Sequence, residues 1–361
     1  MPKNIIICTD GTWDNAAEDT NVVKMSRMLL RTAQQVVFYD DGVGVDGTPL
    51  EKLTGGAFGD GIFQKVKNGY SQIAQVYDQD DALFMFGFSR GAYTARSIAG
   101  MIATCGLPTG GFDDTLVETA FTAYRNPGQR AAILATLGRY SLYDAKITMV
   151  GVWDTVGALG IPALFGGVEA DYQFLNTSLH PDVRNAYHAV SIDERRPQFP
   201  ATLWQVPSPP VPGQALEQAY FAGVHCDVGG GYPETQLSDI TFGWMAGKAR
   251  DLGALFNEAA LAPYETIDAK YALGPRHESW DVVWGVPRYR PIDPTSNLSN
   301  SVPIRFSTDP TYRPPNLALN GSLLAPTYGT VAIVAEPPPA FTLVPPAAPV
   351  PTTPASASTP P

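Results

Sequence analysis

Short apolar runs alternate with segments of helical periodicity over the first 250 residues or so. Each run ends in polar or glycine-rich sequence, which is typical of strands buried in a parallel sheet. The runs predict strands over residues 5–9, 36–39, 82–86, 147–153, 187–192 and 218–224. Apolar residues at intervals of three and four predict helices over 21–33, 62–77, 92–104 and 239–252, with a loop over 55–61. Strands that alternate with helices indicate an α/β fold with a mostly parallel sheet and helices on both faces.

The alternation is interrupted once and fades after residue 256. Residues 107–145 are predicted to be a mainly helical insertion. Its apolar side chains, with those of 158–175, could form a lid over an acyl chain or simply pack the helices together. The pattern predicts a first domain over 1–256, a loosely patterned extension packed on it over 257–336, and a disordered tail over 337–361. Ten of the 25 residues in that tail are proline and none is charged.

Composition excludes several classes of protein. The 361 residues carry a net charge of -11, which disfavours nucleic acid and simple electrostatic docking on anionic lipid. The three cysteines, Cys8, Cys105 and Cys226, have neither disulfide nor zinc spacing. With no signal peptide and no apolar run of about 20 residues, we expect synthesis in the cytoplasm. Delivery through a signal-independent secretion system is compatible with this, and the proline-rich tail could recruit a partner.

The pattern Gly87-Phe88-Ser89-Arg90-Gly91 lies between a predicted strand and a predicted helix. G-x-S-x-G in this context is typical of a nucleophile elbow, in which the serine occupies a strained, sharp turn. Small residues two positions before and after the serine avoid collisions in that turn. The alternative is a glycine-rich turn with no chemistry. We expect Ser89 to be a catalytic nucleophile.

A serine nucleophile needs a base, and the chain has four histidines. His225 follows a predicted strand and enters the glycine-rich sequence 226–232, where a mobile imidazole is expected. His188 lies inside a predicted strand and suits a packed, structural role. His180 suits a surface turn, and His277 lies beyond the well-patterned region. His225 is therefore the preferred base.

The base needs an orienting carboxylate, for which Asp154 is the preferred candidate. It ends the strand predicted over 147–153, and the chain order Ser89, Asp154, His225 is that of α/β-hydrolases. Asp154 could instead cap the following turn. Asp193 and Asp227 are rivals, although Asp227 is too close in sequence to reach the far ring nitrogen of His225.

An oxyanion hole requires two backbone donors. The N–H of Arg90, directly after the serine, is the first, and Gly11 or Thr12, after the first strand, supplies the second. Residues 10 and 11 could instead only form a tight turn. The neighbouring Asp10, Trp13 and Phe88 are predicted to contact substrate.

These candidates are far apart in sequence and share one structural position. Asp10, Ser89, Asp154 and His225 each follow a predicted strand. Because the carboxyl ends of parallel strands meet at one edge of a sheet, we expect their side chains to line one crevice.

Five segments together resemble the α/β-hydrolase domain of type VI secretion phospholipase effectors. They are residues 8–13, 39–44, 87–96, 151–157 and 223–232, within about residues 3–250. The resemblance implies an α/β-hydrolase fold and assigns the catalytic roles to Ser89, Asp154 and His225. It also implies an acyl ester substrate, such as a lipid or phospholipid, with transient contact to a membrane surface.

The resulting expectation is a serine ester hydrolase that needs no cofactor and no metal. An alternative is a metal-dependent phosphoesterase that uses Asp10, Asp154, Asp227 and His225. The serine turn has no explanation in that alternative. Another alternative is a non-catalytic hydrolase-like binding module.

Overall fold

The computed structural model of this protein describes residues 1–11, 19–41, 57–138, 140, 142–156, 178–320 and 323–335. Its centre is an eight-stranded sheet with the order β12-β9-β8-β7-β6-β3-β1-β2, and every pair of neighbours in it is parallel. The strands are β1 (Asn4–Thr9), β2 (Gln35–Asp40), β3 (Ala82–Phe88), β6 (Ile147–Trp153), β7 (Asn185–Ser191), β8 (Ala215–Phe221), β9 (Asn297–Ser299) and β12 (Gly329–Val331). The predicted α/β fold is confirmed.

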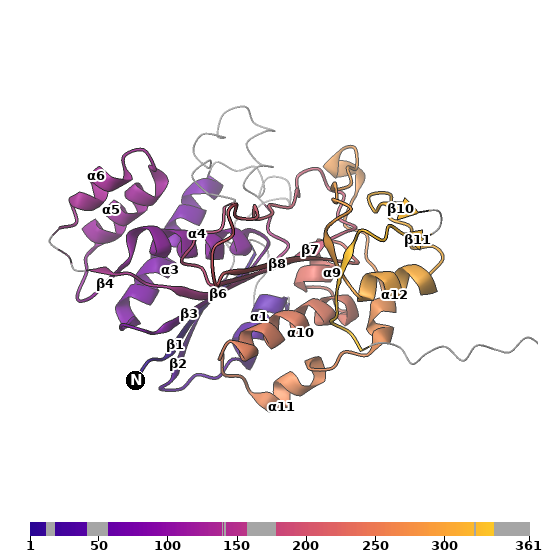
Figure 1. Cartoon of the computed structure of the whole chain (residues 1–361), viewed down its shortest axis with the longest axis horizontal. Helices are drawn as coiled ribbons and strands as arrows, with labels where there is room; N and C mark the ends of the chain where they lie inside the picture. The colour runs from indigo at the N-terminus through magenta and orange to yellow at the C-terminus, as the bar shows by residue number, and fades with distance from the viewer. Residues whose placement is uncertain are drawn as a thin grey trace, which may run out of the picture.

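Helices cover both faces of the sheet (Figure 1). They are α1 (Asn21–Met28), α3 (Ala57–Val76), α4 (Ser89–Cys105), α5 (Asp114–Arg125), α6 (Arg130–Ala135), α9 (His225–Gly229), α10 (Gln236–Asp251), α11 (Glu258–Leu261) and α12 (Ser301–Thr308). Short 3-10 helices span Ala262–Tyr264, Ala269–Leu273 and Val282–Trp284. Two small pairs, β4 (Leu107–Pro108) with β5 (Leu142–Tyr143) and β10 (Leu319–Asn320) with β11 (Leu323–Leu324), lie outside the main sheet.

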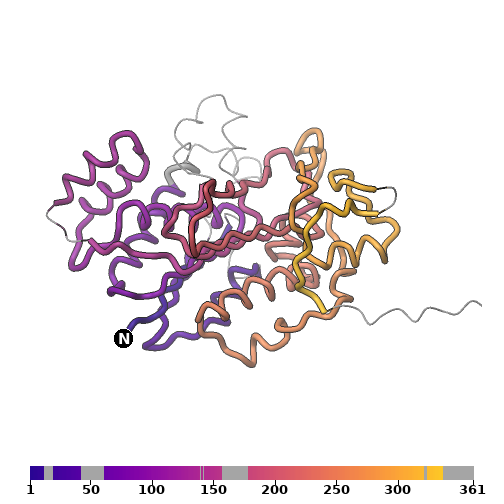
Figure 2. The backbone as a smooth tube through the Cα atoms, viewed as in Figure 1, coloured from indigo at the N-terminus to yellow at the C-terminus, as the bar shows by residue number. Residues whose placement is uncertain are grey.

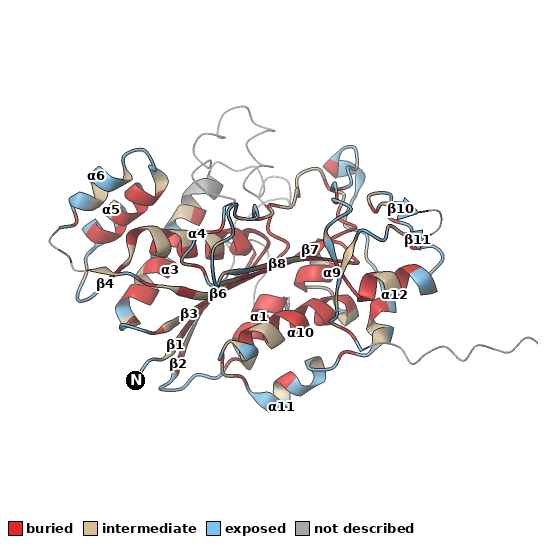
Figure 3. Cartoon of the chain, viewed as in Figure 1, coloured by how far each residue is buried: buried red, intermediate tan, exposed pale blue. Residues whose placement is uncertain are grey.

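Alternation along the central strands divides the core into two layers. Ile5 and Ile7 of β1 pack with the apolar faces of α3, α4 and α5. Ile6 and Cys8 point to the opposite face and pack with α1 and α10. Successive strand side chains point to opposite faces of a sheet, so these unbroken apolar strands are buried on both sides (Figure 3).

Several boundaries differ from those that the sequence predicts. The helix over 21–33 ends at Met28, because Leu29 is extended and bridges to Phe256. The strand predicted over 218–224 spans Ala215–Phe221 instead. Helix α3 begins at Ala57, within the segment 55–61 that is predicted to be a loop. A glycine inside a helix lowers the stability of that helix by only about 1 kcal/mol, so the glycines of this segment do not prevent helix formation.

The segment after residue 256 continues the same sheet. Strand β9 pairs with β8, and β12 pairs with β9. Most of this C-terminal part, orange to yellow in Figure 2, lies at the side of the molecule away from α5 and α6, whereas α11 lies below α10 (Figure 1). The domain boundary at 256 and the packing of 257–336 as a unit stay predictions. The predicted tail over 337–361 lies outside the described residues.

Candidate active site

Ser89 lies in a sharp turn where β3 passes directly into α4. Its φ is +57°, in the left-handed region that side chains rarely adopt. The flanking glycines have no room for a side chain. A Cβ on Gly87 would lie 2.5 Å from the carbonyl oxygen of Gly91, and one on Gly91 would lie 2.1 Å from that of Thr9. The backbone of the G-x-S-x-G segment therefore has the close approaches that the pattern predicts.

His225 lies beside this turn, 136 residues away in sequence. Its Nε2 is 2.8 Å from Ser89 Oγ. The expectation of a glycine-rich loop at His225 is wrong, since His225 is the first residue of α9. The chain leaves β8 at Phe221 and turns at Gly223, whose φ is +111°. A helix begins there because the Asp227 carboxylate accepts from the N–H of Val224 at 2.9 Å.

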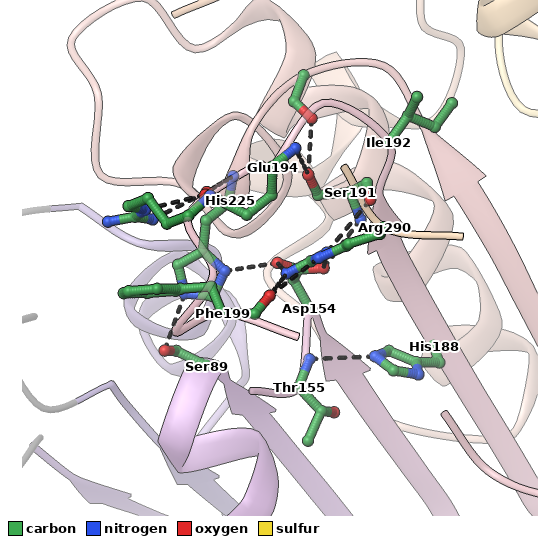
Figure 4. Close-up of polar contacts among 12 residues, drawn as sticks. Ser89, Asp154, Thr155, His188, Ser191, Ile192, Glu194, Phe199, His225 and Arg290 are labelled. Atoms are coloured by element: carbon green, nitrogen blue, oxygen red, sulfur yellow. Dashed lines mark hydrogen bonds and ion pairs between the residues drawn. The ribbon is translucent and has the colours of Figure 1, made fainter. Parts of the chain in front are cut away.

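Asp154 completes the row on the other side of the imidazole (Figure 4). Its Oδ2 is 2.5 Å from His225 Nδ1, and its Oδ1 accepts from the N–H of Ser191 at 2.9 Å. Asp154 directly follows β6, has a φ of +38°, and is fully buried. Since one ring nitrogen of His225 faces a carboxylate, its other nitrogen, Nε2, is free to accept a proton from Ser89.

Arg290 holds the outer side of Asp154 and is absent from the sequence predictions. Its Nη1 donates to Asp154 Oδ1 at 2.6 Å and its Nη2 to Oδ2 at 3.0 Å. The same guanidinium donates to the carbonyl oxygens of Phe199 and Ser191. No motif or periodicity surrounds this residue, so the sequence offered no way to find it.

The charges set the protonation of the pair. Burial would raise the pKa of Asp154, but the ion pair with Arg290 and the hydrogen bond from His225 outweigh it and hold that pKa well below its usual range. Burial lowers the pKa of His225, and the neighbouring Asp154 only partly offsets this. The site therefore holds an ionised carboxylate beside a neutral imidazole near pH 7.

Two aromatic rings hold the imidazole in place. Phe88, the residue before the serine, is fully buried with its ring centroid 4.5 Å from that of His225. Gly229 gives it space, since a Cβ there would lie 2.0 Å from the Phe88 ring. Phe199 packs edge-on against His225 at 5.2 Å. The imidazole is therefore packed between these rings and its hydrogen-bond partners. Substrate contact by Phe88 stays a prediction.

The loop after β1 also lies near the turn at Ser89. The Asp10 carboxylate accepts from the N–H of Gly11 at 2.9 Å and from the hydroxyls of Thr20 and Tyr39 at 2.7 and 3.1 Å. Asp10 is thus engaged in shaping its own loop. The roles predicted for Arg90, Gly11 and Asp10 stay predictions. Thr12 and Trp13 lie outside the described residues, as does the 158–175 part of the predicted lid.

The rival carboxylates are engaged elsewhere. Asp193 accepts from the N–H of Gly223 at 2.6 Å and from the hydroxyl of Tyr312 at 3.1 Å. Asp227 lies 2.6 Å from Nδ1 of His277. Both carboxylates therefore secure the turn before α9 and leave Asp154 to face His225.

The other histidines have separate surroundings. His188 is buried in β7, accepts from the N–H of Thr155 at 3.1 Å, and has its pKa lowered to about 3 by burial. His180 lies at a half-exposed turn, with its Nδ1 3.5 Å from a carboxylate oxygen of Asp182.

The described residues include no group of three or more His, Cys, Asp or Glu side chains arranged to hold a metal ion. Two members of the alternative metal set already have strong partners, since Asp154 pairs with Arg290 and Asp227 faces His277.

Among the described residues, no helix is long and apolar enough to cross a membrane.

Comparison with known proteins identifies the family. The family model described as "T6SS, Phospholipase effector Tle1-like, catalytic domain" matches residues 3–248. The chain belongs to this family. The match includes Ser89, Asp154 and His225, whereas Arg290 lies beyond it.

The uncharacterized protein YEL023C of Saccharomyces cerevisiae is 30% identical over 238 residues, 58% of this chain and 34% of that protein. Among solved structures, an uncharacterized protein from Pseudomonas aeruginosa is 17% identical, with a TM-score of 0.44 over 72% of this chain and 47% of that one. The Tle1 effector bound to the VgrG spike of the type 6 secretion system is also 17% identical, with a TM-score of 0.40 over 64% of this chain and 51% of that one.

A sugar hydrolase, YeeB, from Lactococcus lactis is 12% identical, with a TM-score of 0.36 over 70% of this chain and 91% of that one. The chain spans about a third of the length of the yeast relative and about half of the Pseudomonas structure. The substrate of this chain therefore does not follow from these relatives.

Proposed function

We propose that this protein is a serine hydrolase that cleaves acyl esters of lipids or phospholipids. The observation that carries the proposal is the unbroken row Ser89 Oγ, His225 and Asp154, with contacts of 2.8 and 2.5 Å. The chain order of these residues is that of α/β-hydrolases, and membership of a phospholipase effector family supports a lipid substrate.

In this mechanism the neutral His225 accepts the Ser89 proton at Nε2 while Ser89 Oγ attacks the acyl carbonyl carbon. The N–H of Arg90 stabilises the negative oxygen of the tetrahedral intermediate, and Gly11 could join it only by releasing the Asp10 carboxylate, to which its N–H donates at 2.9 Å. His225 then protonates the leaving alcohol, and the acyl group stays on Ser89. Water attacks the acyl-enzyme, gives a proton to His225, and releases the fatty acid as Ser89 recovers its proton.

Arg290 has a positioning role in this mechanism. Its two bonds hold the Asp154 carboxylate so that Oδ2 faces His225. The ion pair keeps Asp154 ionised, and an ionised Asp154 stabilises the imidazolium that forms in the transition state.

A release assay tests this function. Fatty-acid release from phosphatidylcholine, phosphatidylethanolamine and phosphatidylglycerol is measured beside hydrolysis of p-nitrophenyl butyrate. Ser89→Ala is expected to lose at least about a thousandfold in rate. Ser97→Ala is the control, because Ser97 lies on the same helix and its hydroxyl donates to the carbonyl oxygen of Tyr93. Equal activity of wild type and Ser89→Ala would contradict the proposal.

A further inference from the structure

Exposed apolar side chains gather in one loop, residues 280–289, here called the docking loop. The exposed fractions of Val282, Val283 and Val286 are 76%, 65% and 83%, and that of Tyr289 is 38%. In the described part of the chain, four of the ten exposed large apolar side chains belong to this loop. Such clustering marks an interaction surface, whereas single exposed apolar residues need no explanation.

The base of the docking loop is fixed to the domain. Trp284 is 7% exposed and packs edge-on against Phe199, with ring centroids 5.7 Å apart. Its carbonyl oxygen accepts from the side-chain amide of Gln198 at 3.2 Å, and the Trp280 indole N–H bonds to the carbonyl oxygen of Gly285 at 3.0 Å. The exposed valines therefore belong to a loop whose backbone is fixed in place. Figure 3 shows this loop as an exposed turn above α9.

The docking loop is joined to the candidate active site at two points, its middle and its C-terminal end. Through Trp284 it touches Phe199, whose ring packs against His225. Directly after the loop comes Arg290, which holds Asp154. A membrane surface bound by the docking loop would therefore lie next to the residues that are proposed to hydrolyse the ester.

The chemistry of the loop fits a lipid surface. Its tip is purely apolar, and Trp280 and Tyr289 at its ends are the amphipathic side chains favoured where hydrocarbon meets water. Arg288 is exposed and makes no ion pair within the described residues, so it is available to a lipid phosphate. Asp281 balances this charge, so insertion of apolar side chains is the main source of affinity and anionic lipid is not required.

We propose that the docking loop inserts Val282, Val283 and Val286 into the headgroup boundary of a phospholipid bilayer and so brings the active site to its substrate. The need for such a surface rests on the proposed lipid hydrolysis. The insertion itself can be measured without any catalysis.

The binding test uses the full chain carrying Ser89→Ala, so that the vesicles stay intact, and sedimentation with phosphatidylcholine vesicles. Adding Val282→Ser, Val283→Ser and Val286→Ser together is expected to weaken the partition by about tenfold or more. Val206→Ser is the matched control. Val206 is also 76% exposed, but it lies outside the docking loop, in the segment before β8. Its partition should match that of the parent.

An activity test separates the two proposals. With Ser89 intact, the triple valine variant should hydrolyse soluble p-nitrophenyl butyrate at a rate within about twofold of that of wild type. Its rate of phospholipid hydrolysis on vesicles should be about tenfold lower than that of wild type. Failure of wild type to cleave any ester would reject the proposed function and leave the sedimentation result to decide the docking. Absence of vesicle binding by the parent, or equal binding by the triple variant, would overturn the docking proposal.

Discussion

Replacing Arg290 by Met tests the electrostatic account of the site. The change removes two bonds to Asp154, at 2.6 and 3.0 Å, and those to the carbonyl oxygens of Phe199 and Ser191. Asp154 is fully buried and would keep a charge with no ion-pair partner. Loss of one member of a buried ion pair typically costs about 3–5 kcal/mol, so we expect the free energy of unfolding to fall by about that amount.

The pH dependence of this loss has a definite sign. Arg290 lowers the pKa of Asp154 in the folded protein. The stability that results is fully present above the pKa of Asp154 in the unfolded chain, which is about 4. It is lost as the pH falls through the lower pKa of Asp154 in the folded protein. The difference between wild type and Arg290→Met should therefore be largest at neutral pH and shrink in acid. Urea unfolding at pH 7 and at about pH 2.5 measures it.

The control and a second variant make the result specific. Arg184→Met removes an exposed arginine with no ion pair in the described residues, and its effect should stay within about 0.5 kcal/mol. Adding Asp154→Asn to Arg290→Met removes the stranded charge and should restore part of the lost stability. An Arg290→Met protein as stable as wild type at pH 7 would refute the reasoning.

Three further predictions follow from the site. Gly91→Ala should lower the free energy of unfolding in urea by about 3 kcal/mol or more, because the added Cβ would meet the backbone of Thr9. Gly247→Ala in α10 is the control, because a Cβ there would have no atom within 4 Å, and it should be neutral or stabilise by up to about 1 kcal/mol. Because burial lowers the pKa of His225, the neutral imidazole persists into acid, and the acid limb of kcat/KM should lie below pH 6.5; a limb above pH 7 would contradict this. Ester hydrolysis should be unchanged after dialysis against EDTA, and a loss restored by a divalent cation would favour the metal alternative.

The sequence predicted the centre of the fold better than its edges. The strands around residues 5–9, 82–86 and 147–153 are continuous apolar runs, and such runs have few alternatives to a doubly covered parallel strand. The three-residue strands β9 and β12 are too short to carry a periodicity, and they form because β8 offers them an open edge.

The same contrast holds at the site. Ser89, Asp154 and His225 were found because each follows a recognisable strand, and the structure brings them into contact, although their catalytic roles stay proposals. Arg290 was missed because its link to Asp154 spans 136 residues and depends on how an unpatterned segment folds back onto the sheet. The helix at His225 was missed because four glycines within nine residues favoured a loop.

Covalent labelling tests the central claim most directly. The protein is treated with a fluorophosphonate, and the modified peptide is identified by mass spectrometry. The account predicts one adduct on Ser89 Oγ, abolished in Ser89→Ala and slowed by orders of magnitude in His225→Ala. A folded protein that stays unlabelled, or that is labelled equally fast without His225, would contradict it.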